Sequence, residues 1–387
     1  MGSRNRLGVT TQVFSAADAS PCNVITREMD LVSKGLLLAS ILVLLLASAS
    51  CNLPSRGAAP IAPALSTATP SASVVPSLAP TQVPSELVWL APNFGSKDYT
   101  ALFPMPENWS IARAKINVFK FYLDNVLDNP CQICGDNTLQ AFVRVDAFRK
   151  LSQWGVATAI EVGAVKEWDC TGDEEFHNAD VAIHNVQQNG GKVDLLAMDE
   201  PLIGGQLVVN GRTCQLTPEQ TAAATAHFVE LVRASYPDLV VGDIEPYPYF
   251  SIDQLEAWIA ALEQRGAAPA FFHLDVDLER VRVENQDVSA ALQTLRHFCA
   301  QQGIPFGVIF TSNWTAAGSN SAYFDSTMEW IRTVKAAIGT PQQMIFQSWQ
   351  GPAPSGAHEI PVNLPQNDPD NYSQVRLINE GLAVFGR

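Results

Sequence analysis

The sequence has 387 residues and is acidic, since 39 aspartates and glutamates against 24 lysines and arginines give a net charge of −15. The first 50 residues hold three of these acids and four of these bases, so the remainder carries −16, from 36 acidic and 20 basic residues. A surface of this sign repels phosphate backbones, which excludes nucleic acid as an expected partner. Hydrophobic residues make up 47% of the chain, which excludes a wholly disordered protein.

The N-terminal segment has the pattern of an export signal. Residues 35–50 form an uncharged apolar run that follows a lysine, is shorter than a typical membrane span and leads through small residues into Cys51. This pattern resembles a bacterial lipoprotein signal, and the resemblance implies that Cys51 is lipidated and begins the mature chain. We therefore predict a signal peptide over 29–51 that starts at Met29, after a non-native extension over 1–28. An uncleaved N-terminal membrane anchor is the alternative.

A linker is predicted over residues 52–85, which are rich in proline, alanine, serine and threonine and have almost no charge. Such a segment cannot bury a core, and its prolines favour an extended chain. It would tether the domain over 86–387 to a membrane. We therefore expect an exported protein, held on the extracytoplasmic side of the membrane through a lipid anchor.

Five of the seven cysteines lie in the predicted domain. An exported protein can form disulfides. Cys131 and Cys134 form a Cys-x-x-Cys motif, for which we favour a local disulfide. A redox motif would need a thioredoxin-like βαβ unit and a helix start, which the sequence does not show, and half of a zinc site is disfavoured because no second such motif exists. Cys170 and Cys214 fall in loops after the third and fourth predicted strands and could bridge there. Cys299 is expected to be a core thiol.

Apolar segments bounded by turn residues predict eight buried strands. Pro201 and Pro246 have no N–H to donate and are expected to end the fourth and fifth of them. The predicted strands cover residues 87–94, 116–122, 156–162, 193–201, 239–245, 270–277, 305–313 and 344–349.

Helices are predicted between these strands. Two begin with capping boxes, Thr217 to Gln220 and Ser251 to Gln254, and one ends at Gly155. The predicted helices cover residues 106–114, 138–154, 175–188, 217–235, 251–266, 288–302, 321–338 and 371–385. Strand and helix thus alternate eight times, which predicts a (β/α)₈ barrel of the α/β class over 86–387. An open, doubly wound sheet is the alternative, but it would normally carry a glycine-rich first turn, which residues 93–96 do not provide.

Polar and aromatic residues concentrate at the carboxyl ends of the predicted strands, where barrel enzymes carry their chemistry. Closely placed carboxyl groups push their pKa values apart, which yields one proton donor and one ionised partner. This is the equipment of glycoside hydrolysis, and flat rings nearby could stack on sugars. The aromatic candidates are Trp168, Tyr247, Tyr249, Trp314 and Trp349.

The Met-Asp-Glu-Pro sequence at 198–201 resembles the Asn-Glu-Pro motif of the superfamily of retaining (β/α)₈ glycoside hydrolases. Ser-Trp at 348–349 resembles the tryptophan that serves as a sugar platform in that superfamily. The resemblance implies that Glu200 is the acid/base. Two departures stand out: Asp199 replaces the asparagine, and the end of the seventh strand, 311–314, lacks the glutamate that is the nucleophile in the family.

By position, Glu245 or Asp275 could take the place of that nucleophile. Period-two alternation puts Asp243 on the same face as Glu245, and His273 on the same face as Asp275. The remaining candidates are assigned to substrate binding: Lys120, Glu161, Asp199, Asp243, His273, Asn313, Trp314, Gln347 and Trp349.

These residues also allow other interpretations. Lys120 and Glu161 could be a structural pair, His273 a hydrogen-bonded core histidine, and Asp243 and Glu245 a network with Lys120. Acidic strand ends also suggest a metal-dependent barrel enzyme, although the first strand has no His-x-His motif. A non-catalytic, glycan-binding surface lipoprotein would explain the missing glutamate on the seventh strand. We expect a carbohydrate substrate, and neither a metal nor a cofactor.

Overall fold

The computed structural model describes residues 86–128, 131, 134–208, 211–316, 318–350 and 359–387. The predicted extension, signal peptide with Cys51, and linker lie outside these ranges. None of the helices within them has the length and apolar character needed to cross a bilayer.

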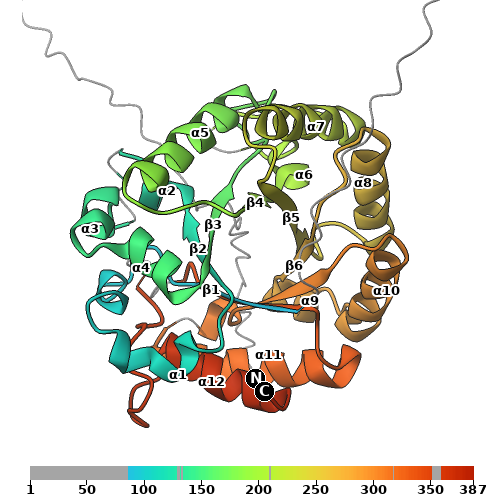
Figure 1. The fold of residues 1–387 in the computed structure, drawn as a ribbon. Coiled ribbons are helices and arrows are strands. Elements are labelled where there is room, and N and C mark those ends of the chain that lie inside the picture. Colours follow the sequence, from blue (N-terminus) through green and yellow to red (C-terminus); the bar gives the residue numbers. More distant parts are fainter. Residues whose placement is uncertain (1–85, 129–130, 132–133, 209–210, 317, 351–358) are drawn as a thin grey trace, which may run out of the picture. The chain divides into compact units, whose positions relative to one another are not determined.

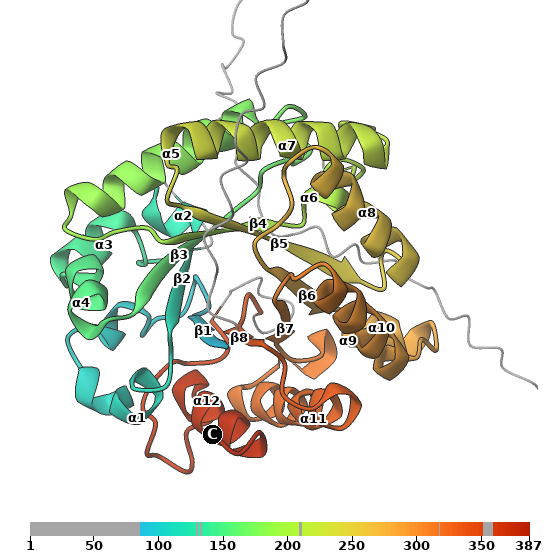
Figure 2. The ribbon, with the colours of Figure 1, turned by 45° about the vertical axis from the view of Figure 1, so that its right-hand side comes forward.

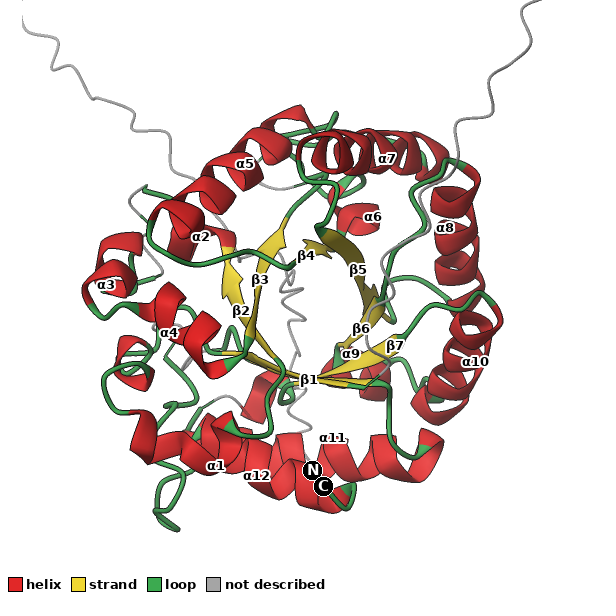
Figure 3. Cartoon of the chain, in the orientation of Figure 1, coloured by secondary structure: helices red, strands yellow, loops and turns green. Residues whose placement is uncertain are grey.

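Eight parallel strands close into a barrel in chain order, which confirms the predicted (β/α)₈ fold (Figure 1). Each strand pairs with its sequence neighbours, and β8 returns to pair with β1. The helices lie around the strands, as Figures 2 and 3 show from two directions. The strands are β1 (Leu87–Ala91), β2 (Val118–Tyr122), β3 (Ala157–Val162), β4 (Leu195–Asp199), β5 (Val240–Tyr247), β6 (Phe272–Val276), β7 (Phe306–Phe310) and β8 (Gln343–Gln347).

The helices begin and end near their predicted signals. Both capping boxes are formed, at Thr217 and Ser251, and Gly155 ends its helix in the left-handed conformation. The longer helices are α3 (Leu139–Arg144), α4 (Ala147–Trp154), α5 (Asp173–Gln188), α7 (Pro218–Ser235), α8 (Ile252–Gln264), α9 (Leu278–Val283), α10 (Val288–Gln301), α11 (Asn320–Ile338) and α12 (Gln374–Val384). The short ones are α1 (Ser110–Arg113), α2 (Leu123–Val126), α6 (Pro201–Gly204) and the 3₁₀ turns Thr100–Leu102, Pro106–Trp109 and Trp314–Ala316.

The single helix predicted over 138–154 is in fact two helices. The chain breaks between α3 and α4 at Asp146, whose φ of 57° is left-handed, a conformation that aspartate tolerates better than most residues. The break changes the direction of the chain so that Phe142 of α3 and Phe148 of α4 both pack against Phe121 of β2. Burial of aromatic surface therefore overrides the continuous helical pattern.

The prediction that Pro246 ends the fifth strand is wrong, because β5 continues to Tyr247. The reason lies in the neighbouring strand: β4 ends at Asp199, opposite Ile244. The Ile244 carbonyl points toward that side, where it accepts a hydrogen bond from Glu200. The backbone nitrogen of Pro246, two residues later, faces the same side. Because β4 has already ended there, the missing N–H leaves no carbonyl of β4 without a donor.

Alternating side chains of the strands build two separate layers of packing. The inward-pointing ones fill the barrel, where Trp89, Ile244 and Ile309 belong to one buried cluster. The outward-pointing ones pack beneath the helices, where Phe272 and Trp258 belong to another. A strand residue therefore reaches the inside or the outside of the barrel according to its place in this alternation.

Both predicted disulfides are present, Cys131–Cys134 and Cys170–Cys214. The second joins the loop after β3 to the loop after β4, and the Cys214 sulfur lies 3.2 Å from the Lys166 carbonyl oxygen. Cys299 is a buried free thiol, as predicted.

Replacing Cys170 and Cys214 together with serine should lower the free energy of unfolding by about 2–4 kcal/mol, because the unfolded chain gains freedom. The residues joined are 44 apart in sequence. The matched control replaces Cys131 and Cys134, which are only three apart, and should cost much less. Denaturant titration without reductant measures both; equal losses would contradict the loop-length argument.

Candidate active site at the barrel mouth

A buried lysine lies at the centre of the barrel mouth. Lys120, on β2, is fully buried and forms an ion pair with Glu161 of β3. Its ammonium also donates to Gln347 Oε1 of β8 at 2.6 Å, and Gln347 Nε2 donates to Glu161 Oε2 at 2.9 Å. Burial raises the pKa of Glu161, and the Lys120 charge opposes this. The structure thus brings these three predicted residues into one closed network.

A second lysine, absent from the sequence-based prediction, neutralises Asp199. Lys166 lies in the loop after β3, and its Nζ is 2.7 Å from Asp199 Oδ2 at the end of β4. Burial lowers the pKa of Lys166, but the neighbouring Asp199 and Glu200 carboxylates raise it further, so the net shift is upward. The residue was missed because its pairing with Asp199 is a contact between a loop and the end of another strand, which leaves no periodic pattern in the sequence.

Glu200 follows β4 directly and starts the turn into α6. Its φ of 53° is left-handed, and its N–H donates to the Ile244 carbonyl of β5 at 3.0 Å. The side chain is partly exposed. Enclosure by protein raises its pKa well above the usual value, and the negative charges of Asp199 and Asp275 raise it further, while Lys166 opposes them.

Asp275 projects from the end of β6 on the inward-pointing face. It is partly exposed, and enclosure together with the charges of Asp199 and Glu161 raises its pKa to about 8. Within the described residues, neither Asp275 nor Glu200 makes a side-chain hydrogen bond or ion pair. Of the four carboxyl groups at the mouth, two are therefore paired with lysines and two are free to take part in proton transfer.

Asp243 and Glu245 share one face of β5, as predicted, but it is the outer one. Asp243 accepts a hydrogen bond from Trp258 Nε1 of α8 at 2.8 Å, and Glu245 accepts one from the Leu202 N–H of α6 at 2.8 Å. Ile244 between them packs inside the barrel. The structure therefore does not bring these two carboxyl groups to the mouth or into contact with Lys120, and the geometry favours Asp275 over Glu245 as the partner of Glu200.

His273 lies deeper in the barrel than Asp275. It is fully buried, its Nε2 is 2.7 Å from Gln343 Oε1, and its ring meets the edge of Trp89. Burial lowers its pKa to about 3, so it stays neutral at physiological pH. This geometry matches the interpretation of a hydrogen-bonded core histidine.

The aromatic candidates differ in their surroundings. Trp349 packs against the cluster inside the barrel, and Trp168 donates to Glu175 at 2.8 Å, next to the Lys166 loop. Tyr249 lies under the Arg280 guanidinium, and its hydroxyl donates to Asp277 Oδ2 at 3.3 Å. Asn313 binds its own loop through Thr315, while the side chain of Trp314 lies outside the described part of the chain.

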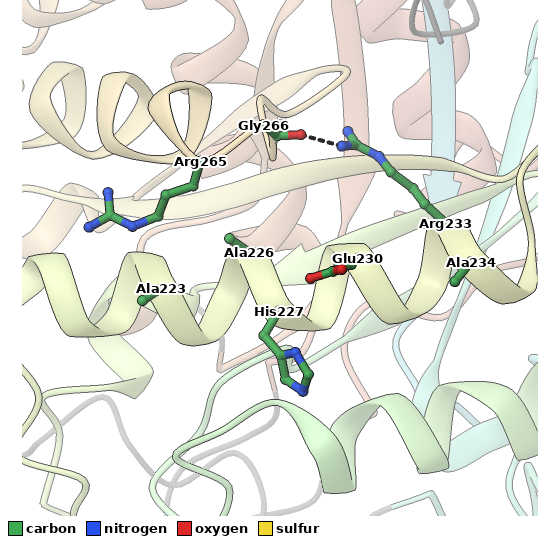
Figure 4. A pocket seen from close by; sticks show the side chains of 8 residues that line it. All are labelled: Ala223, Ala226, His227, Glu230, Arg233, Ala234, Arg265 and Gly266. Atoms are coloured by element: carbon green, nitrogen blue, oxygen red, sulfur yellow. Dashed lines mark hydrogen bonds between the residues drawn. The ribbon is translucent and has the colours of Figure 1, made fainter. Parts of the chain in front are cut away.

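Two further observations, made on the described residues, concern metal binding and a surface groove. No group of three or more histidines, cysteines and acids in these ranges has an arrangement that could hold a metal ion. A surface groove of about 690 Å³ lies on the outer helices rather than at the mouth, between α7 and the end of α8 (Figure 4). Arg233 there donates to the Gly266 carbonyl, and His227 contacts Asp173.

Comparison with known proteins identifies the fold. No protein-family model and no curated protein matches this sequence. Among solved structures, the Ignisphaera aggregans GH53 catalytic domain is 12% identical with a TM-score of 0.51, over 79% of this chain and 99% of that one. A Bacteroides ovatus GH26 β-mannanase is 10% identical with a TM-score of 0.49, over 78% and 90%. Fungal β-1,4-galactanases are 11% identical with a TM-score of 0.48, over 76% and 99%. At 12% identity, the likeness to the Ignisphaera aggregans domain shows the barrel fold alone.

Replacing Lys120 with methionine should lower the free energy of unfolding by about 3–5 kcal/mol, because it leaves a buried carboxyl group without its cation. Adding Glu161→Gln to Lys120→Met should recover part of the loss. Chemical denaturation of the two single variants and the double variant measures the coupling. Strictly additive losses would contradict a direct ion pair.

The buried Asp243 should make the protein less stable at high pH. Burial raises its pKa to about 8, so between pH 4 and 8 the folded state holds a proton that the unfolded chain releases, and stability falls as the pH rises. In Asp243→Asn this fall should be smaller. Urea titrations at several pH values in that window compare the slopes, and parallel curves for the two proteins would contradict the assignment.

Proposed function

We propose that this barrel is a glycoside hydrolase in which Glu200 donates the proton to the glycosidic oxygen. The observation that carries the proposal is the division of the four carboxyl groups at the mouth. Asp199 and Glu161 are held by lysines, whereas Glu200 and Asp275 are unpaired within the described residues and partly exposed. Hydrolysis of a glycosidic bond requires such a pair of carboxyl groups.

The electrostatics favour Glu200 as the proton donor and Asp275 as the ionised partner. The negative charge of Asp275 is one of the causes that raise the pKa of Glu200. The pKa of Asp275, about 8, places the release of its proton at mildly alkaline pH. Once that proton is lost, Glu200 holds its own more tightly and remains a donor. As the bond to the leaving oxygen breaks, the proton passes from Glu200 to that oxygen, and the ionised Asp275 stabilises the positive charge on the sugar ring. A water molecule then bonds to the sugar carbon and loses a proton to one of the two carboxylates, which completes the hydrolysis.

The comparisons support the proposal only through the fold. The Ignisphaera aggregans domain is named a GH53 catalytic domain, so a glycoside hydrolase family uses the same barrel. Barrels of this kind serve many reactions. The assignment of chemistry to this chain therefore rests on its own carboxyl groups and on the Met-Asp-Glu-Pro motif at 198–201.

The proposal extends to location. The apolar segment at 35–50, Cys51 and the linker over 52–85 support an exported enzyme held at the outer side of a membrane by a lipid. Two disulfides are compatible with an oxidising compartment.

One observation favours a second candidate, a barrel that binds glycans without cleaving them. The end of β7 carries no carboxyl group, and Ser312 there is engaged with Gln350 in mutual hydrogen bonds. Such a protein would keep the aromatic side chains and the free carboxyl groups as binding groups.

Glu200→Gln should slow the release of sugars from natural polysaccharides by about 10²–10⁴-fold, because the leaving oxygen departs without a proton. The loss should be much smaller on aryl glycosides whose leaving groups need no proton. Mass spectrometry on a polysaccharide panel measures the first, and absorbance of the released phenol measures the second.

Glu230→Gln is the matched control, since Glu230 lines the groove on α7 and not the mouth. It should leave both rates unchanged. Glycan binding by the native protein without any release would sink the hydrolase proposal and select the binding protein instead.

A further inference from the structure

The turn that carries Glu200 is held by two consecutive residues of β5. The Ile244 carbonyl accepts the Glu200 N–H at 3.0 Å, and the Glu245 carboxyl accepts the Leu202 N–H at 2.8 Å. Pro201, which has no N–H, lies in the chain between Glu200 and Leu202. Glu245 is therefore the side chain that fixes the start of α6, directly after Glu200.

The conformation of Glu200 requires such anchoring. A left-handed φ of 53° is unfavourable for a glutamate and persists only where the surroundings impose it. Leu202 is buried, so its N–H cannot turn to water if the carboxyl group is removed. Loss of the Glu245 oxygen would thus release the turn that points Glu200 into the mouth.

The opposite side of α6 is fixed by close packing. A Cβ added to Gly204 would lie 2.2 Å from the Val165 carbonyl oxygen, so the helix backbone touches the loop that carries Lys166. Lys166 pairs with Asp199, which precedes Glu200. The α6 turn is therefore wedged between Glu245 on one side and the Lys166 loop on the other, and a shift of α6 would disturb both neighbours of Glu200.

Glu245 is suited to this task as a neutral acceptor. It is fully buried on the outer face of the barrel, and its second oxygen has no partner among the described residues. Burial and then the nearby Asp243 raise its pKa well above the usual value, so the group stays protonated at neutral pH. An amide would supply the same acceptor in the same space.

We propose that Glu245 is a positioning residue that holds α6 and thereby keeps the Glu200 carboxyl enclosed between Asp199 and Asp275. The consequence for catalysis rests on the proposed function. The consequence for the surroundings of Glu200 does not rest on that function, so it can be measured without a substrate.

The test compares Glu245→Gln, which keeps the acceptor, with Glu245→Met, which fills the space without one. In the full chain with ¹³C-labelled glutamate carboxyls, NMR follows the titration of Glu200, assigned by the signal that Glu200→Gln removes. The charged groups around Glu200 are Asp199, Asp275, Lys166 and Glu161. Glu245 also interacts with Glu200 through charge, so Glu245→Gln, which removes that carboxyl group but keeps the acceptor, separates the electrostatic effect from the positioning effect. The native protein and Glu245→Gln should show the same raised pKa, and Glu245→Met should lower it by about one unit or more as water enters.

Asp243→Asn is the control, because it changes another buried carboxyl group on the same outer face of β5. Asp243 binds Trp258 of α8 and not α6, so its variant should leave the Glu200 titration unchanged. An unaltered Glu200 pKa in Glu245→Met, or an equal drop in Asp243→Asn, would overturn the proposal. If Glu245→Met does not fold, Glu245→Gln decides, because a Glu200 pKa that falls in spite of the retained acceptor also overturns it.

With a glycan substrate, Glu245→Met should lower kcat more than it raises KM and move the alkaline limb of the pH profile downward, and Glu245→Gln should restore both. If the native protein cleaves no glycan, the proposed function fails, but the NMR comparison still decides the role of Glu245. If the native protein is active and Glu245→Met keeps its kcat and pH profile, only the positioning role fails.

Discussion

The arrangement of the mouth depends on a single buried ammonium group. Lys120 has no exposure to water, and a charge in that position is tolerated only when it is paired and hydrogen-bonded. Glu161 and Gln347 meet this need from β3 and β8, so the interaction joins strands on both sides of β2 across the inside of the barrel. Once Glu161 is committed to Lys120, and Asp199 to Lys166, Glu200 and Asp275 remain as the free acids.

The outer side of β5 forms a second polar layer behind the mouth. Its two carboxyl groups each bind one donor from the helices, a tryptophan ring of α8 and a backbone N–H of α6. Neither carboxyl group hydrogen-bonds to a group in the barrel interior. Glu245, however, binds the N–H of Leu202, which follows Glu200 by two residues. The turn that carries Glu200 is thus joined by a hydrogen bond to the outer face of β5.

The alternation of strands and helices was sufficient to predict the fold, because each buried strand and each cap leaves a local signal. Thr217 and Ser251 show this, since their capping boxes are formed as expected. The inside or outside position of strand residues was harder to predict. Both Glu245 and Asp275 lie at strand ends, but the alternation alone does not say which of the two faces is the inner one; that follows from the strand register around the closed barrel. Lys166 and the short helix α6 were missed because their positions result from contacts between loops, which leave no periodic pattern.

The bond between Cys170 and Cys214 has a consequence beyond stability. It ties the loop of Lys166 to the segment that follows α6, so it restrains both elements that flank Glu200. Oxidation of these two sulfur atoms therefore restrains the backbone on either side of the turn that carries Glu200. A chain with these two cysteines reduced would contain every residue of the site without this restraint.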